Sequence, residues 1–224
     1  MLLYWYFFQR RNGRQKARML PCTRLAVFLH VCAFLTLFAG LAAASMAQGI
    51  PRDAARHQAT LKREAQRVWG INAPVATFAA QVHQESRWRE DARSPVGAVG
   101  LAQFMPATSN WIGGLYVSLA DRAPTNPTWA LRALVTYDKW IADRVKADNP
   151  CERMGFVLQA YNGGLGWVYK RQKLSPQPGR CFGATCAINP GVTPASQRET
   201  QHYPEVILRR FEPLYASWGA GSCP

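Results

Sequence analysis

The spacing of the apolar residues most strongly limits the folds open to this 224-residue chain. From residue 75 onward they recur every three or four positions, as the buried stripe of an α-helix requires. The first such series is Val75, Phe78, Ala79 and Val82. Helices are also predicted over residues 51–69, 128–147, 149–163 and 199–211. Because no long stretch alternates with period two, the sequence predicts an all-α domain.

The N-terminal region predicts export. Residues 25–44 form an apolar run, six basic and no acidic residues precede it, and Ser45-Met46-Ala47 follows with small residues. Charge, apolar run and small-residue exit are typical of a secretory signal peptide, here residues 1–47. The alternative is a membrane anchor retained through residues 25–44, since the run is long enough to span a bilayer.

The charge that remains after this segment indicates a polyanionic partner. The segment holds 6 of the 27 basic residues and none of the 13 acidic ones, which leaves a net charge of +8 on the rest. Such an excess suits nucleic acid, anionic lipid or a cell wall. Export favours the wall, and no zinc-finger spacing or basic helix repeat supports nucleic acid, so we expect no nucleic-acid partner.

Four cysteines follow the predicted signal peptide: Cys151, Cys181, Cys186 and Cys223. In an oxidising compartment an even number of cysteines predicts two disulfides, for which three pairings are possible. Zinc is the weaker alternative, since Cys181 and Cys186 have no paired histidines nearby. We expect neither a metal nor a cofactor.

Glu85 breaks the pattern of its helix. The apolar series that starts at Val75 reaches Glu85 and Ser86 as its next members. A carboxyl at the end of an apolar seam loses solvation, which disfavours its charged form and raises its pKa. Such a group keeps a proton near neutral pH, as a general acid requires.

Glycoside cleavage usually needs a second carboxylate as nucleophile or base. The nearest candidates are Glu90 and Asp91, which on a continuous helix point well away from Glu85. The spacing therefore offers one good acid and no obvious partner.

Four motifs occur in a characteristic order: Gln84-Glu-Ser-Arg-Trp, Ser94-Pro-Val-Gly-Ala-Val-Gly-Leu-Ala-Gln-Phe-Met-Pro, Ala160-Tyr-Asn-Gly-Gly and Glu199-Thr-Gln-His-Tyr. In order and approximate spacing the chain resembles the soluble lytic transglycosylases (SLT domain), which share the goose-type lysozyme-like fold of glycoside hydrolase family 23. The resemblance covers residues 70–212. It implies one helical catalytic domain there, after a helical lead over residues 48–69 and before a C-terminal tail over residues 213–224.

The resemblance implies that Glu85 is the single catalytic acid and base. It matches Ser94 to a serine that orients the substrate, although a plain turn serine before proline is the alternative. Gln103 and Met105 match positions that line the glycan cleft. For Gln103 a structural role, with its amide bonded to backbone, stays open.

Three further site residues follow from the same resemblance. Tyr161 and Asn162 match the Ala-Tyr-Asn motif and are expected to bind substrate, with core packing as the alternative for Tyr161. Tyr203 matches a tyrosine that approaches the catalytic carboxyl. The chain departs from the family pattern at Ala102, at Gly163 and over residues 126–129, which leaves the outer sugar-binding positions in doubt.

The implied activity is cleavage of the β-1,4 bond between N-acetylmuramic acid and N-acetylglucosamine, with 1,6-anhydro ends as products. The alternatives are a hydrolytic goose-type lysozyme, which needs a second acid from Asp91, Asp121 or elsewhere, and a non-catalytic wall-binding module. We expect a periplasmic monomer that binds peptidoglycan strands. Service to a secretion or conjugation apparatus, to a phage or to general wall turnover stays open, as does exo or endo action.

Overall fold

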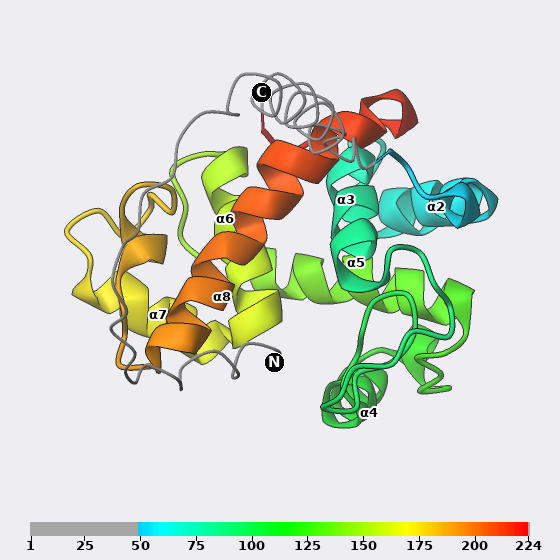
Figure 1. Cartoon of the computed structure of the whole chain (residues 1–224), viewed down its shortest axis with the longest axis horizontal. Helices are drawn as coiled ribbons and strands as arrows, with labels where there is room; N and C mark the ends of the chain where they lie inside the picture. Colours follow the sequence, from blue (N-terminus) through cyan, green and yellow to red (C-terminus); the bar gives the residue numbers. More distant parts are fainter. Residues whose placement is uncertain (1–48, 224) are drawn as a thin grey trace, which may run out of the picture. The chain divides into compact units, whose positions relative to one another are not determined.

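The computed structural model describes residues 49–223 (Figure 1). The predicted signal peptide and its anchor alternative lie outside the described residues. Within residues 49–223, no helix has the length and apolar character needed to cross a bilayer.

The regular structure of the described residues is helical, which confirms the all-α prediction. Two isolated bridges, Arg93 to Val99 and Val99 to Phe104, are the extended pairing found among them. The elements in chain order are η1 (Arg52–His57), α2 (Gln58–Trp69), α3 (Val75–Ser86), α4 (Pro106–Leu115), η2 (Val117–Leu119), α5 (Pro127–Ala142), α6 (Pro150–Gly163), α7 (Leu165–Leu174), η3 (Thr185–Ala187), α8 (Pro194–Glu205), η4 (Val206–Phe211) and η5 (Glu212–Trp218).

Three of these helices start with the same local device. Asn126, Asn149 and Thr193 each precede a proline, and each side chain accepts a hydrogen bond from the backbone N–H three residues later, at 3.0, 3.0 and 3.2 Å. The cap satisfies an N–H that the helix leaves free, and proline at the first position already has the helical φ. Each cap stabilises its helix by about 1 kcal/mol, so the starts of α5, α6 and α8 are set locally.

Helix α3 lies at the centre of the domain. Every residue from Val75 to His83 is buried, because α2, η4 and η5 pack around it. In Figure 1, α3 stands between α2 and the long α8–η4–η5 run, and α5 passes beneath it. A helix buried on nearly every side is held in a fixed position. The last turn of α3, which carries Glu85, is therefore rigidly placed.

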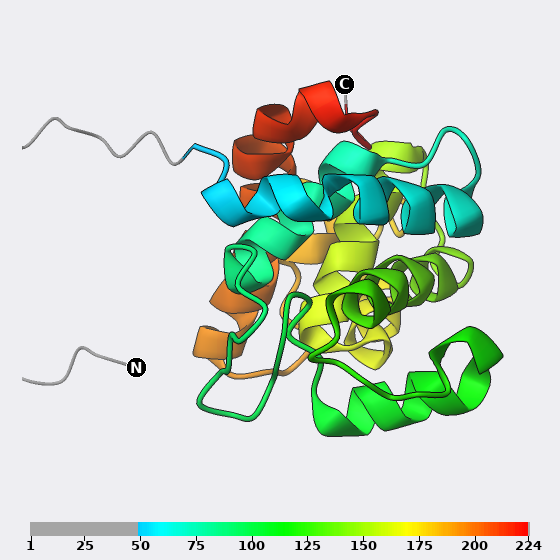
Figure 2. The ribbon, with the colours of Figure 1, turned by 90° about the vertical axis from the view of Figure 1, so that its right-hand side faces the viewer.

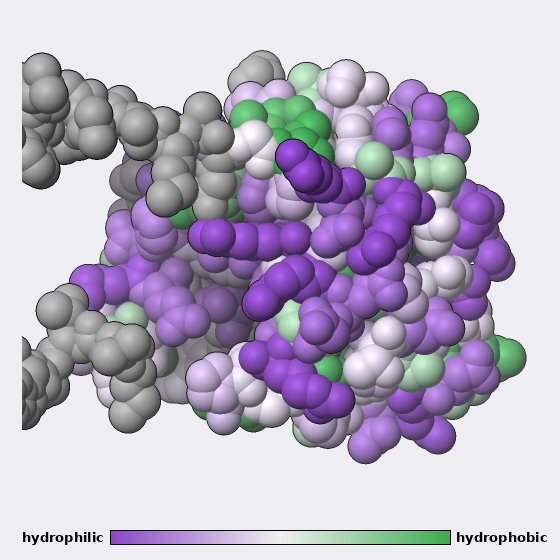
Figure 3. Space-filling model, turned by 45° about the vertical axis from the view of Figure 1, so that its right-hand side comes forward, coloured by the Kyte–Doolittle hydropathy of each residue, from purple (hydrophilic) through white to green (hydrophobic). Residues whose placement is uncertain are grey.

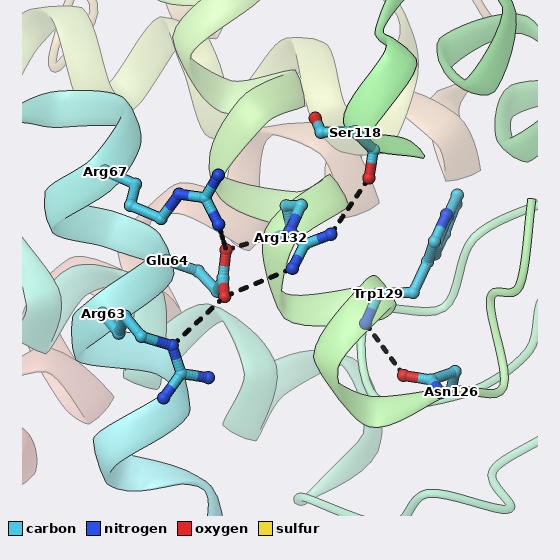
Figure 4. A network of polar contacts seen from close by, with 7 residues as sticks. All are labelled: Arg63, Glu64, Arg67, Ser118, Asn126, Trp129 and Arg132. Carbon is cyan, nitrogen blue, oxygen red and sulfur yellow. Dashed lines mark hydrogen bonds and ion pairs between the residues drawn. The ribbon is translucent and has the colours of Figure 1, made fainter. Parts of the chain in front are cut away.

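An ion cluster around the buried carboxyl of Glu64 joins α2 to α5 (Figure 4). Glu64 on α2 is 1% exposed, and its Oε2 accepts from Arg132 Nε of α5 at 3.0 Å. Arg63 and Arg67 approach the same carboxyl at 3.4 and 3.8 Å, and Arg132 Nη1 donates to Ser118 O at 3.0 Å. Burying a carboxylate is costly unless its charge is paired, and these arginines compensate the charge of Glu64. The cluster fixes α5 against α2.

The lead and the tail belong to the same compact unit as the helices between them. Leu61 and Ala65 of α2 are buried, and η5 packs against α3. Figure 2 shows η5 and α4 at opposite ends of this unit. The side chains on the face drawn in Figure 3 are mostly hydrophilic, as expected once the apolar stripes are buried.

Both predicted disulfides are present. Cys151 at the start of α6 pairs with Cys223, with 4.6 Å between the Cα atoms, and Cys181 pairs with Cys186 at 4.7 Å. The first bond holds the C-terminal segment to α6. Glu152 Oε2 accepts from the N–H groups of Cys181 and Phe182 at 2.6 and 2.9 Å. It anchors the loop that carries the second disulfide.

Candidate active site

Helix α3 ends directly after Glu85 and Ser86. Arg87 and Trp88 follow with left-handed φ angles of 52° and 64°, a conformation that costs a non-glycine residue about 1–3 kcal/mol. Trp88 is fully buried, and its Nε1 donates to Tyr215 Oη at 2.7 Å. Long-range packing of this indole therefore holds the strained helix end, and Glu85 sits in the terminal turn.

The Glu85 carboxyl is partly buried and bonded to one partner from α8. The hydroxyl of Tyr203 donates to Glu85 Oε1. Burial raises the pKa of Glu85 from 4.5 to about 7; the Tyr203 hydrogen bond opposes this shift, and the charge of Glu199 adds to it. A group with this pKa can deliver a proton at neutral pH and accept one back.

A second carboxyl, Asp138 of α5, lies behind the site and is fully buried. Gln81 Nε2 contacts its Oδ1 at 3.4 Å, while Asp138 Oδ2 and Gln81 Oε1 lack hydrogen-bond partners. Burial first, and then the charge of Glu85, raises the pKa of Asp138 well above its usual range. Protonation of Asp138 at Oδ2 would turn this oxygen from an acceptor into a donor. Burial thus favours the neutral form of Asp138, which has no contact with solvent.

Tyr161 of α6 connects the site to the loop after α3. Its hydroxyl donates to Ala102 O at 2.7 Å, and its ring packs near Phe104 and Tyr137 at 5.9 and 5.4 Å between centroids. Burial, followed by the charge of Glu85, raises the pKa of the Tyr161 hydroxyl well above its usual value. Tyr161 therefore remains a neutral donor whose hydroxyl feels the charge of the Glu85 carboxyl.

The loop over residues 92–104 is held by its own hydrogen bonds. Ser94 Oγ accepts from Ala98 N at 2.9 Å, as the turn-serine alternative expects. Gln103 Nε2 donates to Ala92 O and Gly100 O at 3.1 and 2.9 Å, as its structural alternative expects. Gly100 has φ 76°, and a Cβ there would lie 2.1 Å from Pro124 O, so glycine is required. Substrate contact by Ser94 or Gln103 remains a prediction.

The remaining predicted site residues lie at the surface. Met105 is 39% exposed at the start of α4. Asn162 Nδ2 donates to Glu199 Oε1 at 3.4 Å, which joins the end of α6 to α8. Glu90 interacts with η1 instead, because its Oε1 lies 3.2 Å from both Arg56 Nε and His57 Nε2. A hydrogen bond thus links Glu85 to Tyr203, and electrostatic interactions link Glu85 to Tyr161 and Glu199.

The sequence interpretation did not identify Asp138 and Gln81. The signal was present, because Asp138 occupies the apolar stripe of its helix between Val135 and Ile141. The criterion that singled out Glu85, a carboxyl in line with an apolar seam, applies to Asp138 equally.

Comparison with known proteins agrees with this fold. Residues 61–180, more than half of the chain, match the family model described as the transglycosylase SLT domain. The chain belongs to that family. It is 34% identical over 106 residues to the membrane-bound lytic murein transglycosylase F of Pasteurella multocida, a match that covers 46% of this chain and 20% of the relative. The Shewanella pealeana protein of the same name is 31% identical over 125 residues, covering 55% and 24%.

Two solved structures share the fold. The 70 kDa soluble lytic transglycosylase from Escherichia coli superimposes with a TM-score of 0.53 at 22% identity, covering 71% of this chain and 24% of that one. An inactive mutant of the lytic transglycosylase Slt from Pseudomonas aeruginosa gives a TM-score of 0.52 at 22% identity, covering 74% and 25%. The chain spans about a fifth of the length of the first curated relative.

Proposed function

We propose that this chain is a peptidoglycan lytic transglycosylase with Glu85 as its single acid and base. The supporting observation is the pair of carboxyls at the site. Glu85 is accessible and has a pKa of about 7, whereas Asp138 is sealed from solvent and cannot reach a sugar carbon or a water molecule. Membership of the SLT-domain family gives this arrangement its substrate, the wall glycan.

In the proposed reaction, protonated Glu85 donates its proton to the oxygen of the β-1,4 bond between N-acetylmuramic acid and N-acetylglucosamine. The bond from C1 to that oxygen breaks, and the substrate's own acetamido group stabilises the resulting cation. Glu85, now a carboxylate, takes the proton of the muramoyl C6 hydroxyl, whose oxygen closes onto C1. Because the nucleophile belongs to the substrate, no second carboxylate is needed.

Tyr203 and Tyr161 support this cycle. The Tyr203 hydroxyl favours the ionised form of Glu85, which keeps the pKa from rising so far that the second step fails. Tyr161 holds Ala102, and with it the loop that carries Ser94 and Gln103. We assign substrate binding to Ser94, Gln103, Met105, Tyr161 and Asn162, and carboxyl orientation to Tyr203.

Product mass provides the test. Digested peptidoglycan should yield muropeptides that end in 1,6-anhydro-N-acetylmuramic acid, each lighter by one water than the hydrolytic product. Such ends have no reducing aldehyde, so borohydride should leave their mass unchanged, whereas a hydrolytic lysozyme digested in parallel should give reducible ends. Reducible ends from this enzyme would make it a lysozyme. Intact strands despite tight binding would make it a wall-binding module.

The predicted signal peptide supports a periplasmic location for the proposed activity, and the relatives named as membrane-bound support an anchored form as the alternative to test. We expect a monomer. A small domain that cleaves the wall suits local opening at a secretion or conjugation apparatus. Fractionation of cells that express the full chain should find the protein in the periplasm or bound to the inner membrane.

A further inference from the structure

The hydroxyl of Tyr215 contacts two residues that flank the Glu85 carboxyl along the chain. Tyr215, His83 and Trp88 are all buried. Trp88 Nε1 lies 2.7 Å from Tyr215 Oη, and the same oxygen lies 3.1 Å from His83 Nδ1. One atom of the C-terminal segment therefore joins the last turn of α3 to the residue just beyond its end, and Glu85 lies in the stretch between them.

The chemistry of the three groups fixes the direction of both hydrogen bonds. An indole N–H can only donate, so Trp88 donates to Tyr215 Oη. A phenol has one proton, and Tyr215 can donate it to His83 Nδ1 only if that nitrogen carries none. Burial first, and then the charges of Arg87 and Arg210, lowers the pKa of His83 to about 4, so its ring is neutral at neutral pH and Nδ1 can accept.

The segment that carries Tyr215 is fixed against α3. Residues three apart share a face of a 3₁₀ helix, and Glu212, Tyr215 and Trp218 of η5 are all buried. The Glu212 carboxyl accepts from the Thr77 hydroxyl of α3 and from the N–H of Ser222 at 3.2 Å. A disulfide ties the end of the same segment to α6. The Tyr215 hydroxyl is therefore held at a set position along α3.

The backbone between the two contacts needs this constraint. Arg87 and Trp88 adopt left-handed φ angles of 52° and 64°, which end α3 directly after its catalytic turn. Helix ends otherwise fray, and non-glycine residues keep such angles only where the surroundings impose them. Without the hydroxyl, the turn that carries Glu85 would lose its fixed position. Its carboxyl would then accept less effectively from Tyr203.

We propose that Tyr215 is a positioning residue for the transglycosylase reaction. Its hydroxyl joins the residues on either side of Glu85 and so holds the carboxyl where it can accept from Tyr203 and reach the glycan. The proposal rests on the proposed function, which makes Glu85 the acid and base. The match to the family model ends before Tyr215, so it does not include this residue. The predicted tail over residues 213–224 thereby becomes part of the catalytic apparatus.

The first test removes the hydroxyl and keeps the ring. In Tyr215→Phe, kcat should fall about ten- to a hundredfold, the range for a reacting group misplaced by up to about 1 Å. KM should stay within about twofold, because the hydroxyl is buried and does not touch the glycan. The alkaline limb of kcat/KM should move to higher pH, since a weaker bond from Tyr203 favours the ionised form of Glu85 less.

The matched control is Tyr169→Phe, which removes a hydroxyl from an exposed tyrosine on α7 that contacts Arg144 O at 3.3 Å. It should keep the wild-type kcat, KM and pH limb. All variants are compared by release of anhydro ends from soluble peptidoglycan strands, and near-ultraviolet circular dichroism measures the folded fraction of each.

Variants of His83 test the hydrogen-bond chain itself. His83→Phe keeps a ring against Phe211, whose centroid lies 4.1 Å from that of His83, but it has no acceptor. It should lower kcat and move the limb in the same direction as Tyr215→Phe. Asparagine offers an oxygen near the position of Nδ1, so His83→Asn should cleave faster than His83→Phe, with its limb nearer that of the wild type. The two phenylalanine variants combined should lose less than the product of their separate effects.

Wild-type kcat in folded Tyr215→Phe would overturn the proposal. A kcat that falls only with the folded fraction, while the pH limb stays in place, would also overturn it, because that result marks a purely structural role. If Tyr215→Phe does not fold, the His83 variants decide, and equal kinetics in both would count against the proposal. Absence of anhydro ends from wild-type digests would instead refute the proposed function, so the two failures are distinguishable.

Discussion

Replacement of Glu85 by glutamine should abolish cleavage and stabilise the fold. The amide cannot donate the acid proton, yet it matches the carboxyl in size and can still accept from the Tyr203 hydroxyl. It also removes a charge from a site that resists ionisation. Loss of activity together with a gain in stability separates a desolvated catalytic acid from a structural carboxyl.

The raised pKa of Glu85 sets the magnitude and the sign of this change in stability. In the folded protein the pKa of Glu85 is about 7 instead of 4.5, so the native state binds this proton more tightly than the unfolded chain does. The wild-type protein therefore loses stability as the pH rises from about 4.5 to 7, by at most about 3 kcal/mol. Glu85→Gln avoids this loss. The unfolding free energy of Glu85→Gln should equal that of the wild type at about pH 4 and exceed it most above pH 7.

Urea unfolding with intact disulfides at pH 4, 6 and 8 measures the advantage, and loss of wall turbidity measures the activity. Glu205→Gln is the matched control, because Glu205 is an exposed carboxyl on α8. It should keep the activity and change stability by less than about 0.5 kcal/mol at every pH. Near wild-type cleavage by Glu85→Gln, or an advantage that does not grow with pH, would refute the reasoning.

Tyr203→Phe removes the hydrogen bond that favours the ionised catalytic carboxyl, so the alkaline limb of kcat/KM should move to higher pH while the rate falls. Glu199→Gln removes a charge that raises the same pKa, and pH–rate profiles should show that limb at lower pH. Asp138→Asn should leave the limb in place, because burial favours the neutral form of Asp138 and its charge is not among the causes that shift the pKa of Glu85; a downward shift would contradict this. Replacing Cys151 and Cys223 by serine opens a loop of 72 residues and should cost about 4 kcal/mol in urea unfolding.

Local sequence signals predicted most of the helices, although α4 and α7 were not among them. Apolar spacing and the Asn-Pro and Thr-Pro starts act within a few residues, so they can be recognised without the fold. The last helix was predicted from Glu199, but α8 begins earlier, at Pro194, where Thr193 provides the cap. Pro204 lies inside α8, and the helix continues as the π-helical η4 instead of ending there.

The site needed long-range contacts that the sequence does not display. The turn after Glu85 depends on Trp88, which is held by Tyr215 more than a hundred residues away. The choice among three disulfide pairings likewise depends on which Cα atoms meet, and the fold brings Cys151 to Cys223. Asp138 was overlooked because only the apolar residues on the buried face of α5 were considered, although Asp138 lies on that same face.

The two buried carboxyls explain why one acid is enough for the proposed chemistry. Glu85 and Asp138 both have raised pKa values, and burial is the first cause of each. Only Glu85 retains exposure and a hydroxyl partner, so it can exchange a proton with a substrate. Asp138 has no exposed surface, and its ionisation would place a second negative charge beside Glu85 in a region of low polarity. Because burial removes Asp138 as a nucleophile, the arrangement supports the proposed attack by the sugar's own hydroxyl.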